Sequence, residues 1–129
     1  MKPPIAAIAI VLSTQIAAAQ TPVPLSIAEA RAAILAAKSR LWRDPDSVRD
    51  AAISAPKACP VKPELLCVCV EANARNAYGG YSGISTSLIY FRGKTVADSV
   101  EGLYPDGRAR CGKFEPFPEL NGRKTPGRS

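Results

Sequence analysis

The feature that most constrains this chain is its set of four cysteines, Cys59, Cys67, Cys69 and Cys111, with the spacing C-x7-C-x-C-x41-C. An even number of cysteines in a chain of 129 residues is typical of small exported proteins that disulfides hold together. Zinc binding is the competing interpretation, but the spacing lacks the C-x2-C pairs of structural zinc sites, and the sequence contains no histidine. We therefore predict two disulfides and no metal.

Residues 1–19 have the order of a secretory signal peptide. Lys2 precedes an apolar run over residues 5–12, and residues 17–19 are all alanine, which predicts cleavage between Ala19 and Gln20. A membrane anchor is the alternative, but the apolar run is shorter than the roughly 20 residues that a spanning helix needs. We therefore expect an exported protein, either periplasmic or secreted.

Residues 20–117 are predicted to form a single domain, because a segment of about 100 residues allows one core. Residues 118–129 are rich in proline, glycine and charge, and we expect a disordered basic tail there. The whole chain has a net charge of +6, and such a chain can contact an envelope protein or an anionic cell-wall or membrane surface. Export argues against a nucleic-acid partner, and the partner itself stays unknown at this stage.

The hydrophobic pattern predicts one helix and several strands. Ser26 and Glu29 have the spacing of a capping box, and apolar residues then recur at steps of three and four, so we expect a helix over residues 27–43 that ends before Pro45. Strands are predicted over residues 65–74, 84–93 and 94–100, with weaker candidates at 51–55 and 108–114. The expected fold is α+β, with one N-terminal helix packed on an antiparallel sheet of three to five strands.

The strand at residues 65–74 limits how the cysteines can pair. Side chains alternate between the two faces of a strand. We expect the helix to cover one face, which carries Leu66, Val68, Val70 and Ala72. The other face is expected to carry Cys67, Cys69, Glu71 and Asn73. Cys67 and Cys69 point the same way and are poorly placed to bond to each other. Two pairings stay open, and we favour Cys59 with Cys67 and Cys69 with Cys111.

Several catalytic chemistries are disfavoured by composition. Without histidine, no Ser-His or Cys-His pair can form. Carboxylate pairs need a defined separation across a cleft, and nothing in the sequence marks one. Redox-active cysteine pairs usually open a helix, whereas Cys67 and Cys69 lie inside a predicted strand. We therefore expect no catalytic residue, no cofactor and no enzyme.

The segment NARNAYGGYSG, residues 73–83, connects two predicted strands. Asparagine and glycine favour turns, but the segment is longer than a tight hairpin requires, and tyrosine on a glycine-rich backbone is a common way to build a recognition surface. The candidate binding residues are Glu71, Asn73, Arg75, Asn76, Tyr78, Gly79, Gly80 and Tyr81.

This segment, together with the upstream DPDSVRDA, resembles small exported proteobacterial proteins and lipoproteins of uncharacterised function. In those proteins a DP-x-S segment is followed by a motif similar to C-G-E-V-N-A-K-N-x-x-G-G-Y-x-G. The matching residues are Asp44, Pro45, Ser47, Cys69, Glu71, Asn73, Asn76, Gly79, Gly80, Tyr81 and Gly83.

The resemblance covers about residues 41–92 and implies export but no particular activity. The chain departs from the pattern at Val70, where those proteins usually have glycine, and Cys59 and Cys67 look like additions. These departures leave the pairing of Cys69 open.

Two functions are compatible with these patterns. The first is a non-enzymatic binding or structural module of the cell envelope that uses the loop at residues 73–83. The second is a small enzyme or enzyme inhibitor that uses Glu71 with the same loop. A single concave pocket lined by Glu71, Arg75 and Tyr81 would favour the second, whereas a flat or convex loop would favour the first.

Overall fold

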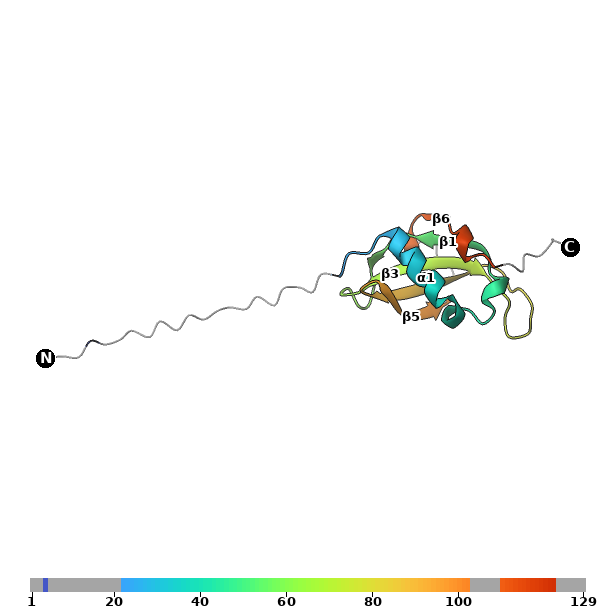
Figure 1. Ribbon diagram of the computed structural model, residues 1–129, viewed down its shortest axis with the longest axis horizontal. Coiled ribbons are helices and arrows are strands. Elements are labelled where there is room, and N and C mark those ends of the chain that lie inside the picture. Colours follow the sequence, from blue (N-terminus) through green and yellow to red (C-terminus); the bar gives the residue numbers. More distant parts are fainter. Residues whose placement is uncertain (1–3, 5–21, 103–109, 123–129) are drawn as a thin grey trace.

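The computed structural model describes residue 4, residues 22–102 and residues 110–122 (Figure 1). The elements are α1 (Ile27–Leu41), the 3-10 helix η1 (Pro45–Ser47), β1 (Arg49–Ser54), β2 (Lys57–Ala58), β3 (Leu66–Asn73), β4 (Ser85–Arg92), β5 (Thr95–Glu101), β6 (Phe114–Pro116) and the 3-10 helix η2 (Pro118–Leu120). Except for residue 4, the predicted signal peptide and its cleavage site lie outside the described residues. No helix in the described part is long and apolar enough to cross a membrane.

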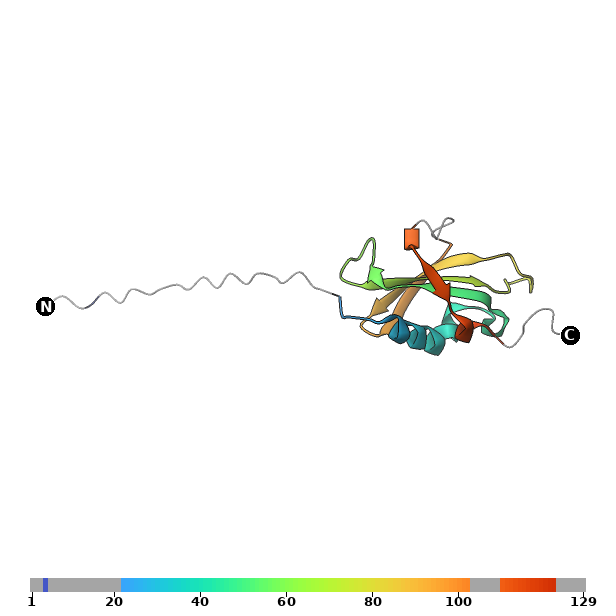
Figure 2. The same ribbon diagram turned by 90° about the horizontal axis from the view of Figure 1, so that it is seen from above.

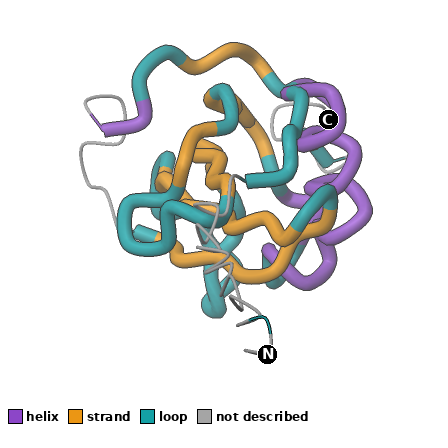
Figure 3. Tube along the Cα trace, turned by 90° about the vertical axis from the view of Figure 1, so that its left-hand side faces the viewer, coloured by secondary structure: helices purple, strands orange, loops and turns teal. Residues whose placement is uncertain are grey.

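The six strands form one antiparallel sheet in the order β5-β4-β3-β1-β6, and β2 pairs with β3 outside this path. Helix α1 packs on one face of the sheet, and Figures 2 and 3 show the two layers from other directions. The predicted α+β fold is confirmed, with six strands instead of three to five. The additional strand β2 lies in a segment for which no strand was predicted.

The main core lies between α1 and the sheet. Ala30, Ile34 and Ala37 of α1 are buried, and Val68 and Val70 of β3 are fully buried on the facing side. Burial of each large apolar side chain contributes about 1.5–3 kcal/mol, so this layer contact stabilises both elements. The alternation predicted for β3 is therefore confirmed. We call the opposite side of the sheet, which carries Cys67 and Cys69, the outer face.

Both ends of α1 follow from local sequence. The Ser26 hydroxyl accepts a hydrogen bond from the Glu29 N–H at 3.0 Å, and the Glu29 carboxylate accepts one from the Ser26 N–H at 3.1 Å, which is the predicted capping box. The Lys94 ammonium group also pairs with Glu29. The helix ends at Leu41 instead of the predicted Arg43, since Trp42 adopts an extended backbone and its side chain is buried.

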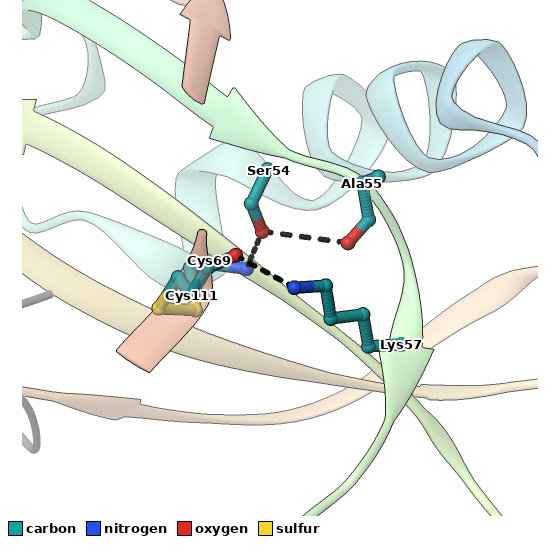
Figure 4. Close-up of a disulfide and its surroundings, with 5 residues drawn as sticks. All are labelled: Ser54, Ala55, Lys57, Cys69 and Cys111. Atoms are coloured by element: carbon teal, nitrogen blue, oxygen red, sulfur yellow. Dashed lines mark hydrogen bonds between the residues drawn. A yellow bond between two sulfur atoms is a disulfide. The ribbon is translucent and has the colours of Figure 1, made fainter. Parts of the chain in front are cut away.

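The disulfides are Cys59–Cys67 and Cys69–Cys111, which confirms the favoured pairing. The four cysteines and Leu88 are buried together as a second apolar cluster on the outer face. Beside the longer disulfide, the Ser54 hydroxyl accepts a hydrogen bond from the Cys69 N–H at 2.9 Å, and Lys57 donates to the Cys111 carbonyl at 3.3 Å (Figure 4). Two disulfides fit a chain that folds in an oxidising compartment and is exported.

The last strand differs from its prediction. Cys111 was expected to lie on a strand over residues 108–114, of which residues 108 and 109 are not described. β6 instead begins at Phe114, after Cys111, and pairs with β1 through Ser54. The disulfide therefore holds the segment that leads into β6, and the strand itself carries no cysteine.

The predicted boundary of the tail at residue 118 is wrong. Residues 118–120 form η2, whose Leu120 is fully buried in the main core together with Phe117. The Gly122 N–H donates to the Val48 carbonyl at 2.7 Å, so the fold continues at least to this residue. Composition misled the prediction, because two apolar anchors in a segment rich in proline and glycine are enough to dock it. Residues 123–129 lie outside the described part.

Candidate functional site

The loop between β3 and β4, which we call the 74–83 loop, closes on itself as a small hairpin. Arg75 and Tyr81 form an antiparallel bridge, and the Asn76 N–H donates to the Gly80 carbonyl at 2.8 Å. The Asn76 side-chain oxygen accepts from the Tyr78 N–H at 2.9 Å and from the Gly80 N–H at 3.3 Å. This use of an asparagine side chain stabilises the tip, where Gly79 has a φ of +80° that favours glycine.

Ser47 fastens this loop to η1. Its side chain is fully buried, and its hydroxyl accepts from the Arg75 N–H at 2.9 Å while it donates to the Asp44 carbonyl at 2.6 Å. The Ser47 carbonyl in turn accepts from the Tyr81 hydroxyl at 2.8 Å. The two segments that carry the resemblance, DPDS and the glycine-tyrosine loop, therefore pack against each other as one structural unit.

The ring of Tyr81 is close to two arginines. The Cζ atom of Arg49 is 3.7 Å from the centroid of the Tyr81 ring, and the Cζ atom of Arg75 is 5.8 Å from it. Guanidinium groups over an aromatic face attract the negative charge of its π-system. Together with the hydroxyl bond to Ser47, this stacking gives Tyr81 a structural role at the base of the loop.

Tyr78 has the opposite environment at the tip of the loop. Tyr78 is 96% exposed, and the neighbouring Gly79 and Gly80 face open space on the side where a side chain would stand. Its backbone is nevertheless held by Asn76. The loop therefore presents one exposed aromatic ring on a closed backbone.

Glu71 and Asn73 lie on the outer face of β3, as predicted, and are only 6% and 7% exposed. Glu71 is opposite Ala52 and Thr86 in the register, and it lines a hollow of about 420 Å³ with Ile84 and Phe114. The side-chain oxygen of Asn73 has no hydrogen-bond partner among the described residues. Neither residue is exposed at the loop tip.

A separate hollow lies where the end of α1 faces the loop, and we call it the loop hollow. It has a volume of about 230 Å³ and is lined by residues that include Arg43, Arg75, Asn76, Ser85 and Glu101. Glu101 accepts a hydrogen bond from the Ser85 hydroxyl at 3.2 Å.

The predicted site residues are thus divided between different places. Arg75 and Asn76 line the loop hollow, Glu71 lines the outer hollow, and Tyr81 stacks on Arg49. Glu71, Arg75 and Tyr81 do not line one pocket together. Within the described residues, no group of three histidine, cysteine, aspartate or glutamate side chains could hold a metal ion.

Sequence reasoning missed three residues of this region. Ser47 was noticed only as part of the DP-x-S match, and its position between α1 and β1 gave no sign that it would meet the loop. Neither Arg43 nor Glu101 was predicted to lie at the loop, because they belong to segments distant from the loop in the sequence. A sequence motif contains only residues that are close along the chain, whereas the loop hollow is lined by three separate segments.

Comparison with protein-family models, with curated proteins and with solved structures finds no match to this chain. The resemblance to small exported proteobacterial proteins therefore stays a prediction. The function must be inferred from the geometry of the loop and its surroundings.

Proposed function

We propose that this chain is a non-enzymatic binding module of the bacterial cell envelope, and that it binds an envelope protein through the tip of the 74–83 loop. The two disulfides and the predicted signal peptide support export to the periplasm or beyond. The observation that carries the proposal is the 96% exposed Tyr78 on a loop closed by Asn76.

The physical reason is that a large ring on an ordered backbone is a good anchor for a partner. Tyrosines are enriched among the few interface residues that carry most of the binding energy. A loop that is already ordered loses less conformational entropy on binding than a flexible one. Asn76 and the Arg75–Tyr81 bridge supply that order before a partner arrives.

The alternative of a small enzyme or inhibitor needs Glu71 to act with the loop. It receives less support, because Glu71 and Arg75 line different hollows and Tyr81 has a structural role. An anionic cell-wall or membrane surface is a further possible ligand of a basic chain, and it becomes an outcome of the test below.

The test is capture of partners from a periplasmic extract by the full exported chain with both disulfides formed. Tyr78→Ala should reduce capture of a specific partner at least about tenfold and leave the melting temperature unchanged, since the ring makes no buried contact. Val61→Ala is the matched control, because Val61 is an exposed apolar residue (82%) outside the loop. Equal capture by all three proteins, or binding to anionic vesicles that Tyr78→Ala leaves unchanged, would contradict the proposal.

A further inference from the structure

The loop hollow exists because small side chains line it. Ala74, Ala77, Ser82, Gly83 and Ser85 contribute little volume where the end of α1 and the loop face each other. Its volume of about 230 Å³ is below the range of about 300–1,000 Å³ typical of pockets for drug-sized ligands. It corresponds to roughly eight water molecules of liquid volume, which suits a ligand of the size of a small amino acid.

Among the described residues that line the hollow, positive side chains outnumber negative ones. Arg43 and Arg75 both line it, and the ion pairs of the described residues involve neither of them. Two arginines in one lining favour a carboxylate, since the fork of arginine donors matches the two carboxylate oxygens. Glu101 adds one negative charge to the same lining, and its carboxylate is oriented by the bond from Ser85.

We propose that the loop hollow binds a small zwitterion, with its carboxylate against Arg43 and Arg75 and its ammonium group against Glu101, as in a free α-amino acid with a small side chain. A simple anion would meet the negative charge of Glu101, and a simple cation would meet the two arginines. A zwitterion satisfies both signs, and this requirement gives selectivity by penalising ligands that carry only one of them. The site is separate from the proposed protein-binding tip, because Tyr78 does not line the hollow.

The test is a titration of the full, oxidised chain followed by NMR chemical shifts and by calorimetry. Alanine is the zwitterionic probe, acetate supplies only the carboxylate, and methylammonium supplies only the cation. Alanine should bind saturably, and the two single-charge probes should bind at least about tenfold more weakly, because each loses one charge-assisted hydrogen-bonding group.

Variants assign the binding to the hollow. Arg75→Gln and Glu101→Gln should each weaken alanine binding about tenfold or more, and Glu101→Gln should also bring the affinities for alanine and acetate closer together. Arg92→Gln is the control, since this exposed arginine of β4 lies outside the lining of the hollow and its loss should leave binding unchanged. Thermal unfolding verifies that each variant is folded. If Arg75→Gln does not fold, Glu101→Gln still tests the proposal.

Three results would overturn the proposal. They are the absence of saturable alanine binding up to tens of millimolar, acetate binding as tight as that of alanine, and equal weakening by Arg92→Gln and Arg75→Gln. The capture experiment with Tyr78→Ala is independent of all three, so a failure of either proposal can be recognised separately.

Discussion

Truncation of the chain after Phe117 removes η2 and residues 121–129, and we expect a large loss of stability. Leu120 is fully buried in the main core, and removing such a side chain typically costs about 2–5 kcal/mol. Two hydrogen bonds to β1 and to the residue before it are also lost. The Ala51 N–H donates to the Asn121 side-chain oxygen at 3.0 Å, and the Gly122 N–H donates to the Val48 carbonyl at 2.7 Å. Each contributes about 0.5–1.5 kcal/mol.

The ion pair between Arg31 and Glu119 adds little to this estimate. Its atoms are 3.6 Å apart and Glu119 is half-exposed, and such surface pairs contribute about 0–1 kcal/mol. The expected decrease in the free energy of unfolding is therefore about 3–8 kcal/mol, a large part of the roughly 5–15 kcal/mol that holds a typical domain together. At about 4–8 °C per kcal/mol, the melting temperature should fall by at least about 12 °C.

The matched control is truncation after Gly122, which removes residues 123–129 and keeps every one of these contacts. Trp42 is the only tryptophan of the chain and is buried, so its fluorescence can follow urea unfolding of both proteins. We expect the longer truncation product to have the midpoint of the full chain and the shorter one to unfold at much lower urea. Equal midpoints for the two products would refute the reasoning, since η2 would then contribute nothing to the core.

Other parts of the structure lead to three further predictions. Replacing Cys69 and Cys111 together by alanine should lower the free energy of unfolding by about 4 kcal/mol, because their disulfide closes a loop of 42 residues. Replacing Cys59 and Cys67 together should lower it by about 2.5 kcal/mol, because that disulfide closes only 8. Chemical denaturation of the two double variants measures both losses, and a larger loss for the Cys59–Cys67 variant would contradict this prediction. Ser47→Ala should cost about 1–3 kcal/mol, since it leaves the partly buried Arg75 N–H without its partner, and hydrogen exchange of that amide should accelerate. Unchanged exchange would count against the bond. The Lys94 ammonium group and the Ser26 N–H hold the pKa of Glu29 below its usual 4.5, so its contribution to stability is complete above about pH 4.5 and is lost as the pH falls through the lowered value. Glu29→Gln should remove this part of the pH dependence in acid unfolding, and an unchanged acid profile would argue against the pairing.

The parts of the fold that could be predicted depend on local periodicity. The period of two in residues 65–74 placed Val68 and Val70 toward α1 and both cysteines on the outer face, and this assignment also excluded one disulfide pairing. The capping box fixed the start of α1 within one turn. In each case the information lies within a few residues of the feature, so neighbours along the chain are sufficient.

The C-terminal segment and the loop hollow could not be predicted in this way. Phe117 and Leu120 are two apolar residues in a polar stretch, and only the core of the folded protein reveals that both fit into it. The hollow unites Arg43, Arg75 and Glu101, which belong to three separate segments. Tyr81 was predicted as a binding residue by its place in the motif, but its hydroxyl bonds to η1 and its ring stacks on an arginine.

Ser47 explains how the structural and binding roles of the 74–83 loop can be separated. It follows Arg43 by four residues and bonds to Arg75 and Tyr81, so the two arginine-bearing walls of the loop hollow are tied together through one buried side chain and its carbonyl. A change at Ser47 should therefore disturb both the stability of the loop and the spacing of the guanidinium groups. Tyr78 makes none of these contacts, and a change there should alter only what the tip binds. Loss of alanine binding in Ser47→Ala, together with its retention in Tyr78→Ala, is the pattern that this division of the loop requires.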